Sequence, residues 1–135
     1  MHWIVELICI AGVLVTFNVV ARAWSLLPEK IPIHFGISDK PDNWGRKVWI
    51  VMMPVLSVLV WFCMMIVPAA APPVSGNTSW MMWLCQVDVS WMFAYITWRW
   101  IKVALGEAEG LGLLWIAFLI PYIGFFLLIP RHAMH

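Results

Sequence analysis

The side chains best suited to chemistry gather in one polar segment, residues 24–47, between two apolar runs. His34 stands there with the nearby carboxylates Glu29, Asp39 and Asp42. An imidazole with carboxylates suits zinc or a similar ion. Because a single histidine with irregularly spaced carboxylates is no metal-ligand motif, we predict no metal site and keep His34 as a weak candidate ligand.

A structural role is the alternative for the same segment, and we favour it. In an extended strand, Ile31, Ile33 and Phe35 would face the helix ends, whereas His34 would face water. Asp42 or Asn43 is placed to cap a helix that starts soon afterwards. The residues that we assign to recognition or capping are Pro28, Pro32, His34, Phe35, Asp39, Asp42, Trp44 and Lys47.

A second group of polar side chains falls inside an apolar run. Asp88 lies near the middle of residues 79–101, and at 100° per residue it shares a stripe with Tyr95 and Arg99. Asn18 of the first run is a further member of this predicted intramembrane network. Such a group can serve as a proton, ion or peptide site, or as a hydrogen-bonded clasp between helices. We favour the clasp, because a relay needs more than one ionisable group at that depth.

Several functions are excluded by what the sequence lacks. The four histidines, which haem ligation would need inside the helices, all fall outside the apolar runs: His2, His34, His132 and His135. The motifs of serine hydrolases, zinc proteases and nucleotide-binding proteins are missing. With a net charge of +1, nothing favours nucleic acid. We therefore predict a protein that is not an enzyme and has no cofactor.

The elements that must position these residues are membrane helices. Hydrophobic residues make up 64% of the 135 residues and charged ones 11%, which is too apolar for a soluble domain of this size. Apolar runs near 3–23, 48–67, 79–101 and 111–129 each match a hydrocarbon core of about 30 Å. We predict an all-α integral membrane protein: a single domain, 1–135, with four transmembrane helices.

The connections predict how these helices are arranged. The short link at residues 106–110 forces antiparallel neighbours, which favours an up-and-down bundle with an ordered loop at 24–47. Pro54 and Pro121 predict local bends inside two spans. Lysine and arginine are concentrated on the side of residues 24–47, which by the positive-inside rule places that loop in the cytoplasm.

Tryptophan is unusually frequent, with 11 residues. Trp3 and Trp24 flank the first run, and Trp80 and Trp98 flank the third, as expected of interface belts. Others, such as Trp61, fall deeper. These deep rings can pack inside the bundle or against another membrane protein, a lipid, a quinone or a pigment.

The polar segment contains the stretch Leu27-Pro28-Glu29-Lys30-Ile31-Pro32-Ile33-His34-Phe35, followed by Gly36-Ile37-Ser38-Asp39-Lys40-Pro41-Asp42-Asn43-Trp44-Gly45-Arg46-Lys47. This stretch resembles the membrane domain at the head of SdpI-type bacteriocin immunity proteins. The resemblance implies protection against a membrane-active peptide toxin, and in some members sequestration of a repressor. It also implies that the loop lies outside the cell, opposite to the prediction from lysine and arginine.

The expected function is recognition. We predict a small protein of the bacterial inner membrane, in contact with lipids, that docks another protein or a peptide through its first loop. The alternative is a structural accessory subunit that stabilises a larger membrane complex, such as an energy-transducing one.

Overall fold

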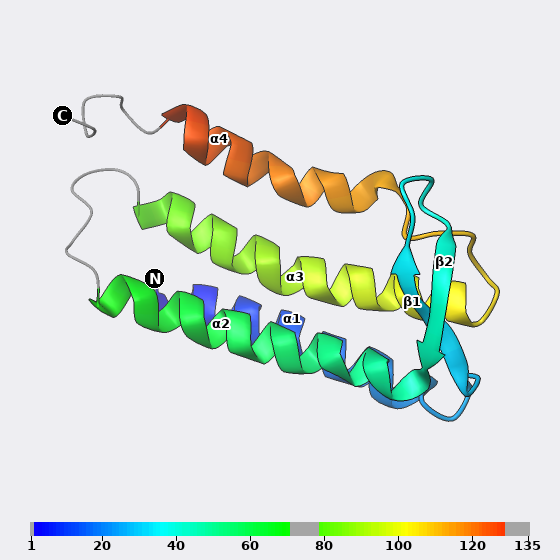
Figure 1. Ribbon diagram of the computed structural model, residues 1–135. Coiled ribbons are helices and arrows are strands. Elements are labelled where there is room, and N and C mark those ends of the chain that lie inside the picture. The colour runs from blue at the N-terminus through cyan, green and yellow to red at the C-terminus, as the bar shows by residue number, and fades with distance from the viewer. Residues whose placement is uncertain (1, 71–78, 129–135) are drawn as a thin grey trace.

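The computed structural model describes residues 2–70 and 79–128, and these residues are mostly helical (Figure 1). The long elements are α1 (His2–Ala23), α2 (Met52–Ala70), α3 (Ser79–Ala104) and α4 (Ile120–Leu128). The 3-10 helices η1 (Lys47–Val51) and η2 (Leu113–Leu119) lead into α2 and α4. Strands β1 (Lys30–Phe35) and β2 (Pro41–Arg46) follow α1 and form one antiparallel hairpin.

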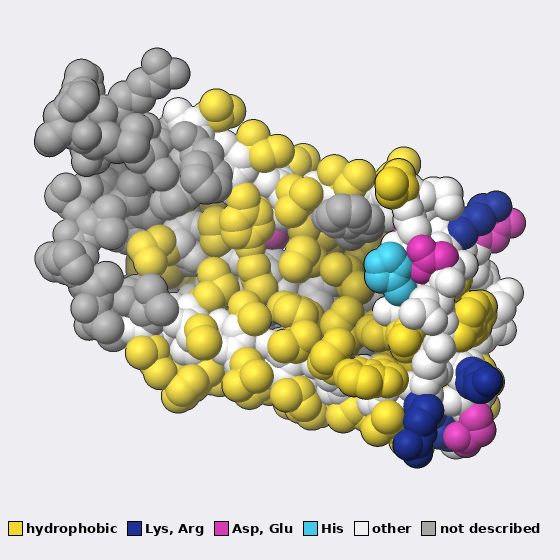
Figure 2. Space-filling view, in the orientation of Figure 1, with side chains coloured by type: hydrophobic (Ala, Val, Ile, Leu, Met, Phe, Trp, Pro, Cys, Tyr) yellow, Lys and Arg dark blue, Asp and Glu magenta, His cyan; other side chains and the backbone are white. Residues whose placement is uncertain are grey.

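The helices lie side by side, and the hairpin covers one end of them (Figure 1). The helix α3 is central, because it packs against α1, α2 and α4. Side chains on the helices are largely hydrophobic at the surface, whereas most of the visible charges gather at the hairpin end, with one acidic side chain visible among the helices (Figure 2). This distribution separates an apolar body from a polar end.

Two of the described helical segments, Trp3–Ala23 and Lys47–Ile66, are long and apolar enough to cross a membrane. This finding indicates membrane association. The helix α3 has 26 residues and is less apolar than these two segments, since it contains Gln86, Asp88, Arg99 and Lys102. The element boundaries nevertheless lie close to the four predicted apolar runs.

Each of the two prolines at which we expect bends lies close to a change of helix type. Pro54 lies in the first turn of α2, just after η1, and Pro121 is the second residue of α4, just after η2. Because proline has no N–H to donate, it is tolerated at the start of an α-helix. In both places the chain therefore enters the α-helix through a 3-10 turn.

The helices α1 and α3 approach closely where Gly12 faces Ser90. A Cβ atom on Gly12 would lie 3.1 Å from the carbonyl carbon of Ser90, so the backbones are nearly in contact. Nearby buried hydroxyls bond within their own helix: Thr16 donates to the Gly12 carbonyl and Ser90 to the Gln86 carbonyl, at 2.9 and 3.0 Å. Small side chains, and hydroxyls that donate to a carbonyl of their own helix, are typical of helix pairs in lipid.

The predicted ordered loop at 24–47 is a β-hairpin, so the expectation of an all-α chain is wrong in this segment. Lys30 pairs with Arg46 and Phe35 with Pro41, with irregular register around His34. The residues of β2 (PDNWGR) are mostly poor strand formers. The second strand exists because β1 supplies a partner, and single-sequence patterns do not show such pairing.

A small hydrophobic core joins the hairpin to the helix ends. Ile31 and Ile50 are fully buried there, together with Val20, Ala23, Leu27, Trp100 and Ile101. Ile33 and Phe35 pack against this core, whereas His34 is exposed. Ile31, Ile33 and Phe35 therefore face the core and His34 faces water, as expected, but the alternation is incomplete because Pro32 is also fully buried.

Candidate functional site: the hairpin and the helix ends beneath it

The tip of the hairpin binds the loop between α3 and η2. Asp39 adopts a left-handed backbone conformation (φ 59°), which places its carboxylate over residues 110–112. Its Oδ1 accepts the N–H of Leu111 at 3.1 Å, and its Oδ2 accepts the N–H of Gly112 at 2.7 Å. A carboxylate that accepts two backbone N–H groups makes strong, charge-assisted bonds. The tip is therefore fixed in place.

Gly110 makes this approach possible. A Cβ atom at that position would overlap the backbone oxygen of Asp39 and would lie 2.6 Å from its Oδ2. Gly110 is buried, and only a residue without a side chain leaves room for the hairpin tip. Gly112 (φ 78°) has the positive φ that glycine favours.

The same loop is held from its other side by α3. Arg99 donates from Nε to the Leu111 carbonyl at 3.0 Å and from Nη2 to the Gly110 carbonyl at 2.6 Å. The Tyr95 hydroxyl donates to the Leu111 carbonyl at 3.4 Å. The buried backbone of this loop thus has partners for both its N–H and its carbonyl groups.

The base of the hairpin is anchored separately. The indole Nε1 of Trp100 donates to the carbonyl of Pro32. The N–H of Lys47 continues the strand pairing to the carbonyl of Glu29 at 2.9 Å, and the Lys47 ammonium lies 3.5 Å from the Glu29 carboxylate. The same ammonium stands 5.1 Å from the centre of the Trp24 ring. Because both its base and its tip are bound, the hairpin is held in place across the ends of the helices.

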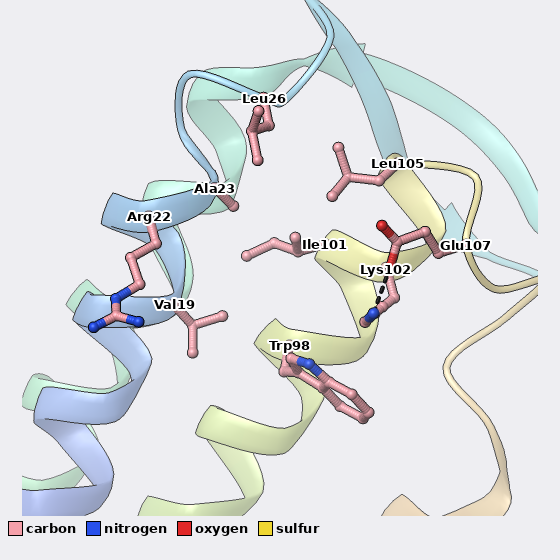
Figure 3. Close-up of a pocket in the computed structure, with 9 residues that line it drawn as sticks. All are labelled: Val19, Arg22, Ala23, Leu26, Trp98, Ile101, Lys102, Leu105 and Glu107. Atoms are coloured by element: carbon pink, nitrogen blue, oxygen red, sulfur yellow. Dashed lines mark hydrogen bonds and ion pairs between the residues drawn. The ribbon is translucent and has the colours of Figure 1, made fainter.

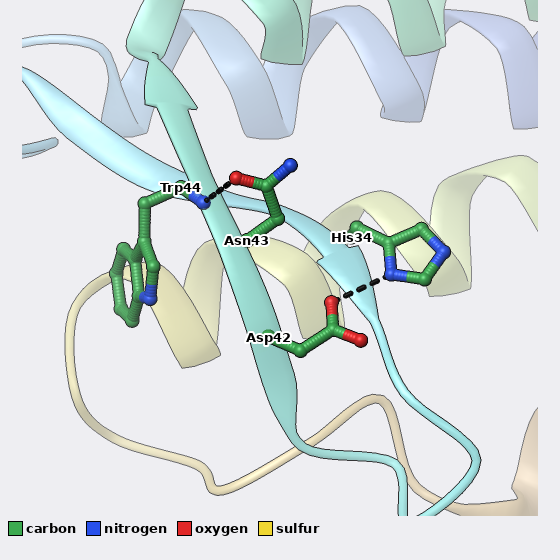
Figure 4. A network of polar contacts seen from close by, with 4 residues as sticks. All are labelled: His34, Asp42, Asn43 and Trp44. Atoms are coloured by element: carbon green, nitrogen blue, oxygen red, sulfur yellow. Dashed lines mark hydrogen bonds and ion pairs between the residues drawn. The ribbon is translucent and has the colours of Figure 1, made fainter.

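The outer face of the hairpin presents side chains to solvent. The Nδ1 atom of His34 lies 2.6 Å from Oδ1 of Asp42, and both side chains are more than half exposed (Figure 4). Asn43 accepts the N–H of Trp44 at 2.9 Å, and the Trp44 ring is 53% exposed. Ile37, in the turn, is fully exposed. We call the exposed side chains His34, Ile37, Asp42 and Trp44 together the outer face, although the Trp44 ring lies on the other side of β2 from the His34–Asp42 pair (Figure 4).

The predicted helix-capping role of Asp42 and Asn43 is wrong. Both residues belong to β2, and the N-cap of η1 is Arg46, whose side chain makes no capping bond. Strand pairing holds Asp42 beside His34 instead. The capping interpretation assumed that a turn, and not a strand, precedes the second helical segment.

The carboxylates near His34 in the sequence are divided among separate partners. Asp42 alone reaches His34, whereas Asp39 binds residues 111 and 112 and Glu29 binds Lys47. Within residues 2–70 and 79–128, no group of three or more His, Cys, Asp or Glu side chains could hold a metal ion. His132 and His135 lie outside the described residues.

The predicted intramembrane network is not one network. Tyr95 and Arg99 do share a partner, the Leu111 carbonyl. Asn18 is exposed on α1, and Oδ2 of Asp88 is buried with no hydrogen-bond partner among the described residues. Tyr95 and Arg99 lie on one stripe of α3, as predicted, but the partner that they share is the Leu111 carbonyl and not Asp88.

A polar cluster that we did not predict joins three helices. Glu6 of α1 accepts the Trp61 indole N–H of α2 at 3.0 Å and the Gln86 amide of α3 at 3.1 Å. The signal in the sequence is Glu6 itself, an acidic residue within an apolar run and close enough to its end to reach the interface. We call Glu6, Trp61 and Gln86 the inner cluster.

Comparison with known proteins gives one finding. Residues 11–58 match the family model for a domain of unknown function (DUF1648). The matched stretch covers the second half of α1, the hairpin, η1 and the start of α2. This domain is the one found in SdpI-type proteins. No curated protein and no solved structure matches the chain.

Proposed function

We propose that this chain is a small, non-enzymatic protein of the bacterial inner membrane that recognises another protein or a peptide through the outer face of its hairpin. The observation that carries the proposal is the contrast between the two faces of the hairpin. Its inner side is bound by Trp100 and its tip by residues 111 and 112, whereas its outer face makes few contacts within the chain.

Rigidity is what a recognition surface needs. Ordering a loop upon binding costs free energy, and a loop that is already ordered avoids that cost. The hairpin is ordered by a buried Ile31, by the carboxylate of Asp39 and by the indole of Trp100. The exposed Trp44 and Ile37 then offer apolar contact area, and the His34–Asp42 pair offers polar contacts.

We place the chain in the membrane with four spans, α1, η1 with α2, α3, and η2 with α4. Only 28% of the apolar window of α1 and 17% of that of the second segment are buried within the chain. Core helices of soluble proteins are mostly buried, so this exposure favours contact with lipid. The 26 residues of α3 extend about 39 Å, enough for a tilted span.

The test is partner capture with the full-length chain in its native membrane. Affinity purification in a mild detergent should recover a protein or peptide with the unaltered chain. A Trp44→Ala and His34→Ala double variant should recover much less of it, since both side chains are exposed and the fold does not depend on them. A Phe62→Ala variant, exposed on α2, is the matched control. Equal recovery by all three chains would refute recognition through the outer face.

A second function, that of a structural accessory subunit in a larger membrane complex, is favoured by Trp91. This tryptophan lies in the middle of α3 and is 38% exposed, so its ring offers apolar contact area to another membrane protein. Stoichiometric co-migration with a large complex in native gels would support this function. A chain that migrates alone, and whose deletion sensitises cells to a peptide toxin, would favour the immunity-like function.

A further inference from the structure

A groove of about 290 Å³ lies between the last turns of α1 and α3, beside the hairpin end (Figure 3). Val19 and Ala23 of α1 and Ile101 of α3 line it with apolar side chains. Leu26 and Leu105 continue this lining toward the hairpin. The volume lies at the lower limit of small-molecule sites, so it would hold part of a lipid and not a whole one.

Two cations stand at the edge of the groove, and the Arg22 side chain extends from α1 on the side away from Lys102 of α3 (Figure 3). Arg22, in the last turn of α1, is exposed and makes no ion pair with any described residue. Lys102, in the last turn of α3, pairs with Glu107 and stands 5.8 Å from the centre of the Trp98 ring. Helix C-termini carry partial negative charge, so these side chains must supply any attraction for an anion.

The groove also lies at the depth of the lipid headgroups, if α1 and α3 span the membrane as proposed. Trp24 and Trp98, which are both more than one-third exposed, mark that level beside it. An apolar groove that continues into a pair of cations at this depth matches one kind of molecule. That molecule has an anionic phosphate joined to an acyl chain.

We infer that this groove is a binding site for an anionic glycerophospholipid. The phosphate binds Lys102 and Arg22, whose exposed side chain turns toward α3 to reach it, and the upper part of one acyl chain lies along Val19 and Ile101 toward the hydrocarbon core. Glu107 competes with the phosphate for Lys102, so it limits the affinity. The site is distinct from the outer face, and it depends on the proposed membrane topology but not on the proposed partner.

The experiment is a lipid titration of the purified full-length chain, followed by native mass spectrometry. Dioleoyl-phosphatidylglycerol should bind at least about fivefold more tightly than dioleoyl-phosphatidylcholine, since each basic residue near the interface contributes about a factor of five. Glycerol 3-phosphate, which has the anion without the chains, should not compete at equal concentration. Equal binding of the two lipids, or effective competition by glycerol 3-phosphate, would overturn the inference.

Two variants test whether the preference for phosphatidylglycerol depends on the groove. Arg22→Gln should reduce the preference for phosphatidylglycerol about fivefold, and Arg22→Lys should keep most of it. Arg46→Gln removes the same charge from the exposed hairpin and serves as the control. An equal loss from Arg22→Gln and Arg46→Gln would show a general charge effect and would overturn the site.

Glu107→Gln gives a readout that a purely structural role would not produce. It frees Lys102 from its ion pair, so the affinity for phosphatidylglycerol should rise about fivefold. Glu109→Gln, which removes the same charge from an exposed position outside the groove, is its matched control. No rise from Glu107→Gln beyond that of Glu109→Gln would contradict the role of Lys102. Failure of these tests would leave partner capture by Trp44 and His34 unaffected, so the two proposals fail separately.

Discussion

Asp39 and Arg99 bind the same short stretch of backbone from opposite sides. Asp39, at the hairpin tip, accepts the N–H groups of Leu111 and Gly112, and Arg99, on α3, donates to the carbonyls of Gly110 and Leu111. Neither side chain needs to contact the other, because the loop between them carries both kinds of partner. This arrangement ties the hairpin to the helices at a point remote from its base.

Removing the carboxylate of Asp39 should loosen the hairpin tip. Asp39→Ala loses both bonds to residues 111 and 112 and also the tolerance for a left-handed backbone, so we expect a loss of about 2–4 kcal/mol. Asp39→Asn keeps one acceptor and tolerates that backbone, so it should lose about half as much. Unfolding by SDS in mixed micelles measures both changes. Asp42→Asn, on the exposed pair, should change stability by less than about 0.5 kcal/mol, and a similar loss there would contradict the assignment.

Adding one methyl group at Gly110 should have a comparable effect. In Gly110→Ala the new Cβ would overlap the backbone of Asp39, which cannot move without leaving its partners. We expect a loss of at least about 2 kcal/mol and faster proteolysis within the hairpin. Gly124→Ala is the control, because nothing lies within 4 Å of a Cβ there. The prediction fails if the two variants are equally stable.

The inner cluster should contribute to helix association. Glu6→Ala removes the acceptor for both Trp61 and Gln86, and hydrogen bonds between membrane helices contribute about 0.6–2 kcal/mol each. We expect a loss of about 1–3 kcal/mol in SDS unfolding. Glu6→Gln keeps one acceptor and should recover at least half of it. If Glu6→Ala leaves the free energy of unfolding unchanged, the inner cluster does not hold the helices together.

Asp88→Asn should keep the fold. The buried Oδ2 makes no hydrogen bond among residues 2–70 and 79–128, so an amide of the same shape removes no observed contact. We expect a change in unfolding free energy below about 1 kcal/mol. Circular dichroism and gel filtration in detergent measure the outcome. Severe misassembly would instead show that the carboxylate itself is required.

The helix boundaries could be predicted because the cause is local. An apolar run of about 20 residues needs no distant partner to be recognised, and residues 3–23 and 48–67 lie within the observed helical segments. The alternation of Ile31, Ile33 and Phe35 was equally local, since one strand face must pack on an apolar surface. Such patterns reflect periodicity within one element.

The candidate site depended on contacts between distant residues, and these were not predicted. Asp39 reaches residues that follow it by 72 and 73 positions, and no local pattern marks such a pairing. The second strand was missed because Asp42 and Asn43 are turn-forming types. Glu6 was missed because a residue near a helix end can reach water, and only the positions of Trp61 and Gln86 show that it faces inward.

The measurement that tests the central claim most directly is site-specific photo-crosslinking in the native membrane. A photoreactive phenylalanine analogue at Trp44, on the outer face, should form one discrete crosslinked product with a protein or peptide. The same analogue at Phe62, exposed on α2, should form no such product. Identical products at both positions, or none at Trp44 while the chain is folded and in the membrane, would contradict recognition through the hairpin.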